Sequence, residues 1–133
     1  MSKNTFFADV AAGHECFIGE NAEKEVVFYV WTRRYQDTRA RNDRRYIYPI
    51  TEKNEIHFFS AATKKEYRRN HIYSCGIAFL EEYFGKTGFN KISCTVQRNN
   101  YPAVRALMKN NFIITGKQMN VVSLLGIRIR RGI

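Results

Sequence analysis

Glu55 and His57 are the two residues of this sequence whose types and spacing suit proton transfer. They stand two positions apart in the apolar segment 55–61, which predicts a β-strand. Side chains alternate between the two faces of a strand, so Glu55 and His57 share one face. Both are candidates for a general base. Two alternatives stay open: Glu55 as a solvated carboxylate at the strand entry, and His57 as a hydrogen-bonded imidazole of the core.

A basic segment follows this strand and leads into the first long helix. It contains four cationic side chains, Lys64, Lys65, Arg68 and Arg69. From residue 72 the apolar residues recur at the spacing of a helix. The free N–H groups and partial positive charge of a helix N-terminus attract anions. The sequence therefore predicts an anion site at the N-terminus of this helix.

The remaining pattern is β-rich and contains a second helix. Asn100 is suited to cap that helix, with Pro102 in its first turn. Asn110 and Asn111 can end it, because asparagine tolerates the left-handed backbone conformation. Strands are predicted at residues 15–19, 25–31, 55–61, 91–96, 112–116 and 120–129, and helices at about 72–84 and 100–109. This order predicts an α/β (α+β) fold, a mixed, mostly antiparallel sheet with two main covering helices.

Length and composition predict one folded domain. A chain of 133 residues with 44% hydrophobic residues and two prolines buries about two-thirds of its surface on folding, so disorder is excluded. No apolar run approaches the ~18 residues of a membrane helix, and the N-terminus is too polar for a secretory signal. The three cysteines are widely spaced, which argues against a disulfide framework and a metal site. A cytoplasmic protein with no membrane partner is expected.

The charge balance indicates an anionic partner without naming it. The 22 Lys and Arg exceed the 12 Asp and Glu by 22 − 12 = 10. Nucleic acid, a cofactor with several phosphates, an anionic membrane surface and a partner protein all remain possible. The segment 32–54 resembles a long loop, which is either a binding surface or a solvated stretch. It contains six arginines, Arg33, Arg34, Arg39, Arg41, Arg44 and Arg45.

Residues 55–112, with the strand pair before them, resemble the GNAT superfamily of acyl-CoA-dependent N-acetyltransferases in the order of their landmarks. That family has a strand, an Arg-x-x-Gly-x-Gly/Ala loop opening a helix, a second strand, and Asn-x-x-Ala opening a helix that ends in Gly-Phe. The corresponding landmarks here are residues 55–61, 68–73, 92–96, 100–103 and 111–112. The resemblance implies a single GNAT-like domain over residues 1–133 with a splayed central strand.

The resemblance also implies an activity and its site. It implies transfer of an acetyl or other acyl group from acetyl-CoA to a primary amine, of a small molecule or a nucleotide sugar, with Glu55 and His57 as candidate bases. In the family, the loop and helix N-terminus bind the coenzyme A pyrophosphate, and the splayed strand polarises the thioester carbonyl. The residues carried over as cofactor-binding are Ala61, Ala62, Thr63, Arg68, Arg69, Asn70, His71, Ile72, Tyr73, Ser74, Asn100 and Ala103.

The sequence departs from the family pattern in three ways. Asn111 replaces the glycine before Phe112, a mild change because asparagine tolerates the left-handed cap. The other two departures leave an alternative function open. His71 and Tyr73 replace the two loop glycines, which is tolerable if both have the negative φ of a first helical turn. Leu107 stands where many members have the tyrosine that protonates the leaving thiolate, and Tyr73 or Tyr101 is a candidate substitute. The alternative is a catalytically degenerate GNAT module that binds nucleic acid or a protein partner.

The short N-terminal region predicts a homodimer. Only about thirteen residues precede the first predicted strand, whereas family members have a strand and two helices there. The acceptor side is therefore expected to be reduced, or to be completed by a second subunit. The sequence does not identify the acceptor amine.

Overall fold

Four strands form the main sheet of the computed structural model, which describes residues 3–35, 50, 52–97, 99–114, 119–124 and 127–132. They are β1 (Glu15–Glu20), β2 (Val26–Arg34), β3 (Glu55–Thr63) and β4 (Lys91–Cys94), in that spatial order. The β1–β2 and β2–β3 pairs are antiparallel, and the β3–β4 pair is parallel. This confirms the predicted mixed sheet.

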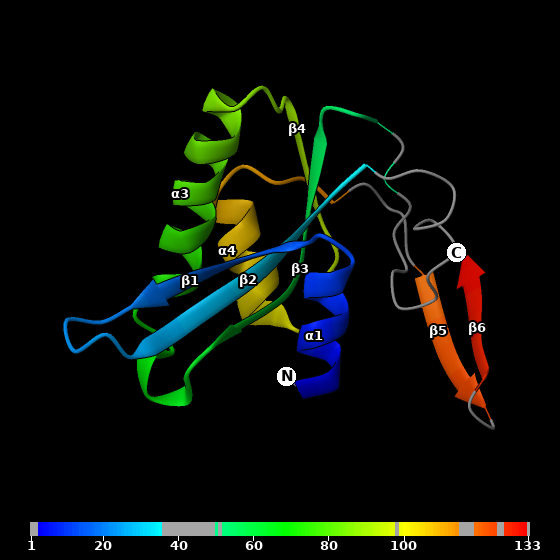
Figure 1. The fold of residues 1–133 in the computed structure, drawn as a ribbon, viewed down its shortest axis with the longest axis horizontal. Helices are drawn as coiled ribbons and strands as arrows, with labels where there is room; N and C mark the ends of the chain where they lie inside the picture. Colours follow the sequence, from blue (N-terminus) through cyan, green and yellow to red (C-terminus); the bar gives the residue numbers. More distant parts are fainter. Residues whose placement is uncertain are drawn as a thin grey trace.

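Helices cover both faces of the sheet (Figure 1). The predicted pair is present as α3 (Ile72–Lys86) and α4 (Tyr101–Lys109), and a short 3-10 helix, η1 (Lys65–Tyr67), precedes α3. The helix α1 (Lys3–Ala11) was not predicted. Its ring contact between Phe6 and Trp31 places it on the face opposite α3. Sequence patterning missed it because Phe6, Phe7 and Val10 are exposed and form no buried stripe.

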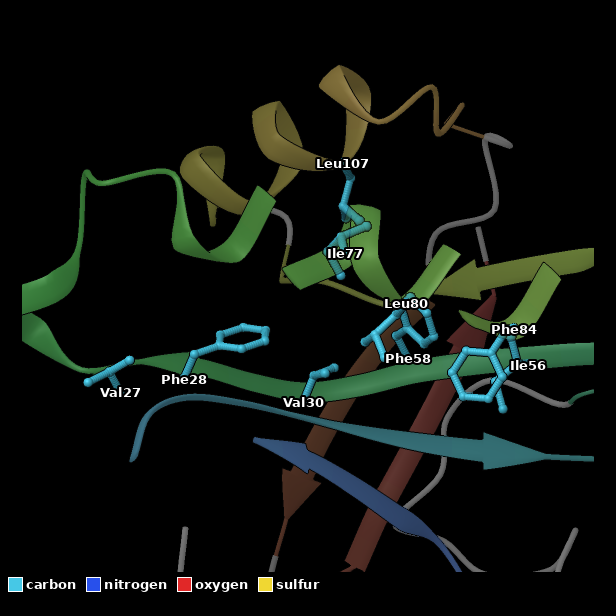
Figure 2. Close-up of a cluster of buried hydrophobic side chains, with 9 residues drawn as sticks. All are labelled: Val27, Phe28, Val30, Ile56, Phe58, Ile77, Leu80, Phe84 and Leu107. Carbon is cyan, nitrogen blue, oxygen red and sulfur yellow. The ribbon is translucent and has the colours of Figure 1, made fainter. Parts of the chain in front are cut away.

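The core lies between the sheet and the pair α3 and α4 (Figure 2). Phe28, Ile56 and Phe58 point from the strands toward Ile77 and Leu80 of α3. Leu107 adds the contribution of α4 and is 6% exposed. A Cβ at Gly76 would lie 2.6 Å from the Phe28 ring, so the glycine lets α3 approach the sheet at this point.

The second strand is longer in the structure than the sequence predicted. The strand β2 continues through Arg33 and Arg34, and Arg33 is 5% exposed, so these two arginines belong to the sheet and not to the predicted loop. The other four arginines of that segment lie outside the described residues.

The C-terminal strands also differ from their prediction. Residues 112–114 form no strand, because Asn111 turns the chain with a φ of 65° and the Phe112 amide donates to the Leu107 carbonyl at 3.0 Å. The predicted strand over residues 120–129 is instead an antiparallel hairpin of β5 (Met119–Leu124) and β6 (Ile127–Gly132). β-branched composition alone cannot show whether a segment finds a pairing partner.

Candidate active site

The parallel pair of β3 and β4 opens partway along its length. Glu55 to Phe58 pair with Lys91 to Cys94. Beyond that point β3 continues to Thr63 along β2, whereas β4 ends at Cys94. The pairing of β3 with β4 therefore stops at Phe58 and Cys94, which is the splayed arrangement expected from the resemblance. The opening exposes backbone that a closed sheet would pair.

A β-bulge marks the edge of this opening on β3. Trp31 pairs with Phe59 and Tyr29 pairs with Ala62, so β3 contains one residue more than β2 across this interval. Ser60 has a φ of 50° and is exposed. A bulge interrupts the ladder and redirects the backbone groups next to it. The bulge adjoins Ala61, Ala62 and Thr63, the residues expected to act on a thioester carbonyl.

The N-terminus of α3 lies at the open end of the β3–β4 pair. Tyr73 packs edge-on against Phe28 with ring centroids 6.0 Å apart, and Phe28 pairs with Thr63 at the end of β3. The Tyr73 side chain also lies beside the Cys94 thiol. Burial raises the pKa of Tyr73, with further contributions from Cys94, and burial raises the pKa of Cys94 to about 11. Both groups are neutral near pH 7.

Polar contacts fix the basic loop that precedes α3. The Asn21 amide donates to the Tyr67 hydroxyl at 2.9 Å, and Arg68 Nε donates to the Thr63 carbonyl at 3.0 Å. Lys64 forms an ion pair with Glu25. Arg69 and His71 are exposed. The loop is thus tied to the β1–β2 turn and to β3 while its outer cations face solvent, an arrangement suited to an anionic ligand.

The loop departs from the negative φ expected at the first glycine position. His71 caps α3 with a φ of 58°, and Arg69 has a φ of 70°. Glycine takes such angles without the steric cost that a Cβ imposes. The expectation of negative φ was therefore wrong for His71. Tyr73 lies within α3, where its side chain is accommodated.

Glu55 and His57 share one face of β3, as the alternation predicted, and this is the face opposite α3. They belong to a hydrogen-bonded network that connects β3 to Ser93 of β4 and to Thr95, the residue that follows β4. His57 Nδ1 lies 2.8 Å from Ser93 Oγ, and His57 Nε2 lies 3.1 Å from Thr95 Oγ1. Ser93 Oγ donates to Glu55 Oε2 at 2.5 Å. The parallel register that pairs His57 with Ser93 brings these groups together.

Burial determines the protonation of His57. His57 is 1% exposed, and desolvation, with a smaller contribution from the Arg33 guanidinium, lowers its pKa to about 3. It is a neutral imidazole at pH 7. Glu55 is 0% exposed, so the solvated carboxylate left open by the sequence is wrong, and its Oε1 faces the Lys91 ammonium at 3.6 Å. The hydrogen-bonded core imidazole left open for His57 is what the structure has.

The helix α4 presents the remaining predicted residues. The Asn100 side chain accepts a hydrogen bond from the Ala103 amide at 3.4 Å, which confirms the predicted N-cap. Tyr101 is 64% exposed in the first turn. Leu107 is buried in the core, and its hydrocarbon side chain has no proton to donate. At the other end, Asn110 Nδ2 donates to Ser74 Oγ at 3.0 Å and ties α4 to the start of α3.

Sequence reasoning missed Ser93 and Thr95. Their own strand alternates in the same way as β3, and a parallel pairing of the two strands places Ser93 beside His57. The alternation was visible in the sequence, but the register that selects these two hydroxyls was not.

Comparisons with known proteins bear on the fold. No protein-family profile matches the chain, and no curated protein matches it in sequence. Solved structures do match. The ribosomal-protein-S18-alanine N-acetyltransferase of Escherichia coli aligns with a TM-score of 0.68 at 15% identity, over 98% of this chain and 72% of that one.

Two further matches cover similar shares. An acetyltransferase of the GNAT family from Streptococcus pneumoniae has a TM-score of 0.64 at 18% identity, over 96% of this chain and 70% of that one. The aminoglycoside 6′-N-acetyltransferase of Acinetobacter baumannii has a TM-score of 0.63 at 11% identity, over 95% and 84%. The chain therefore has the α+β fold of GNAT N-acetyltransferases.

Proposed function

We propose that this protein is an acyl-CoA-dependent N-acetyltransferase that transfers an acetyl group to a primary amine. The observation that supports it is the parallel β3–β4 pair that opens beyond Phe58 and Cys94, beside the N-terminus of α3. The opening gives an acyl thioester a place between two strands, and the helix terminus gives a pyrophosphate its N–H donors. The acyl-CoA supplies an activated carbonyl carbon.

The residues present fit such a co-substrate at both ends. At the phosphate end, the left-handed backbone at Arg69 and His71 is the kind of conformation a glycine loop uses. Lys65, Arg68 and Arg69 are exposed there, and Asn70, Ile72 and Ser74 complete the loop and first turn. At the acyl end, the bulged segment of Ala61, Ala62 and Thr63 would orient the carbonyl oxygen.

The chemistry at the acyl end needs a proton acceptor for the amine. Glu55 and His57 are the candidates, and their network reaches Thr95 beside the opening. Leu107 cannot protonate the departing sulfur. A thiol with an ordinary pKa of about 8.5 leaves as the thiolate near neutral pH. Tyr101, exposed on α4, stays a candidate for a donor.

Calorimetry with acetyl-CoA tests the proposal. We expect one site with micromolar affinity, weakened about tenfold or more by Arg69→Glu, with Lys86→Glu on the far end of α3 as a matched charge-reversal control. Release of coenzyme A thiol is then followed with lysine, spermidine, glucosamine and tryptamine as acceptors. No binding at millimolar acetyl-CoA would overturn the proposal.

The degenerate-module alternative has one specific observation in its favour, the buried Leu107. Salt-sensitive binding to mixed oligonucleotides, without affinity for acetyl-CoA, would distinguish this alternative from the enzyme. Such a result would replace the enzyme proposal.

A further inference from the structure

We propose that Thr95, His57, Ser93 and Glu55 form a proton relay, in which Thr95 meets the acceptor amine and the buried Glu55 carboxylate receives the proton. This inference rests on the proposed function and specifies its base. It assigns roles to two hydroxyl groups that the resemblance does not point to.

Geometry makes the four side chains one continuous chain. Thr95 Oγ1 lies 3.1 Å from His57 Nε2, and His57 Nδ1 lies 2.8 Å from Ser93 Oγ. Ser93 Oγ lies 2.5 Å from Glu55 Oε2. Each separation is a hydrogen-bond distance. Both nitrogens of the imidazole are therefore engaged, one toward the opening and one toward the carboxylate.

Counting hydrogens fixes the direction of the chain. A serine hydroxyl has a single hydrogen, and that of Ser93 is donated to Glu55. Ser93 Oγ must then accept from His57, so the imidazole has its hydrogen on Nδ1. In the neutral ring Nε2 is then an acceptor, and its partner Thr95 must donate. Every donor points from the opening toward the carboxylate.

Exposure assigns the ends of the chain. Thr95 is exposed and immediately follows Cys94, where the pairing with β3 stops. Glu55 and His57 are 0% and 1% exposed, so a substrate cannot touch either of them. An imidazole whose pKa is lowered to about 3 does not store a proton at pH 7. It can pass one on, provided that the other ring nitrogen releases its hydrogen at the same time.

The transfer balances in protons and charge. The substrate ammonium gives one proton to Thr95 Oγ1 as the Thr95 hydrogen moves to His57 Nε2. The Nδ1 hydrogen moves to Ser93 Oγ, and the Ser93 hydrogen moves to Glu55 Oε2, which becomes a carboxylic acid. The amine lone pair then forms the N–C bond, the C–S bond breaks with its electrons on sulfur, and the second N–H proton neutralises that thiolate. After product release the reverse transfer to water restores Glu55.

Two matched pairs of variants test the relay. Thr95→Val removes the hydroxyl at constant shape and Thr95→Ser keeps it; Ser93→Ala and Ser93→Thr do the same one step further along. We expect Thr95→Val and Ser93→Ala to lower kcat about 10²-fold to 10⁴-fold, with the acetyl-CoA Kd unchanged within about twofold. Thr95→Ser and Ser93→Thr should stay within about tenfold of wild type. Equal kcat values for Thr95→Val and Thr95→Ser would overturn the relay. The acceptor used is whichever of the four amines turns over fastest.

Imidazole ¹⁵N spectra give a readout that does not depend on activity. The His57 signals, assigned with His57→Gln, should show the Nδ1–H tautomer in wild type and a shift toward Nε2–H in Ser93→Ala. An Nε2–H tautomer in wild type reverses the chain and overturns the relay even if acetyl-CoA is turned over. An Nδ1–H tautomer in a protein that binds no acetyl-CoA overturns the proposed function instead.

Discussion

The two halves of β3 differ in almost every respect. In the paired half, Glu55 to Phe58 lie beside β4 and are buried, including a carboxylate and an imidazole. In the open half, β3 contains a bulge with a left-handed Ser60, and Ser60 and Ala61 are exposed. One strand therefore holds a dry polar network at one end and accessible backbone at the other.

Under the proposed function, the paired half of β3 would accept a proton and the open half would bind the acyl group. A buried carboxylate is costly unless its neighbours satisfy it, and the second strand supplies Ser93 and Lys91 for this purpose. Where that strand leaves, the backbone is free to face a ligand. Thr95 stands at the junction and connects the two environments.

Replacing Gly76 with alanine should lower the stability, because the added Cβ disturbs the packing beneath the open half. Its Cβ would lie 2.6 Å from the Phe28 ring. Overpacking costs about 1–3 kcal/mol, and the gain in helix propensity returns at most about 1 kcal/mol. Urea unfolding of Gly76→Ala should show a net loss. The control is Gly85→Ala, where a Cβ meets nothing within 4 Å and stability should rise by up to about 1 kcal/mol. Equal shifts in the two variants would contradict the packing argument.

The buried His57 in the paired half should make the free energy of unfolding depend on pH. Its folded pKa of about 3 lies below the unfolded value of about 6.5. Between these values the unfolded chain binds a proton that the folded chain does not, so stability falls as pH falls, by at most about 1.4 kcal/mol per pH unit. The Arg33 guanidinium contributes to this lowering of the pKa, after desolvation.

Unfolding free energies measured between pH 7 and pH 4 test this dependence. His57→Gln should flatten the slope relative to wild type, whatever its effect on stability at pH 7. His71→Gln, which alters an exposed imidazole, should leave the slope unchanged. A His57→Gln slope equal to that of wild type would show that His57 is not the source.

His71, at the N-terminus of α3 beside the open half of β3, should show the smallest effect on stability. His71 has a φ of 58°, which costs a residue with a Cβ about 1 kcal/mol relative to glycine. His71→Gly should therefore raise the free energy of unfolding by up to about 1 kcal/mol and bind acetyl-CoA at least as tightly. His71→Ala keeps the strain and should not be stabilised. Equal stability of these two variants would contradict the assignment of strain to this loop.

The sequence predicted most of the elements that position the site, and it failed where a segment's structure depends on contacts elsewhere. The strand with Glu55 and His57, the helix after the basic loop and the Asn100 cap follow from alternation, periodicity and capping chemistry. The helix α1, the end of β2 at Arg34 and the irregular backbone after Asn111 do not. Each depends on what the segment packs against. The homodimer and the transfer to a primary amine stay predictions. None of the described helices combines the length and apolar character that a membrane crossing requires.

The sequence by itself determined that Glu55 and His57 share a face and that a basic helix start follows them, because both properties come from local periodicity and chain order. Only the tertiary structure decided that Glu55 is buried, that His71 is left-handed, and that Ser93 and Thr95 complete the network. Those facts depend on the register between β3 and β4 and on where that pairing ends. Register is a relation between two strands separated by a helix. The alternation within each strand excludes a slip by one residue but not a slip by two, which keeps every side chain on its face.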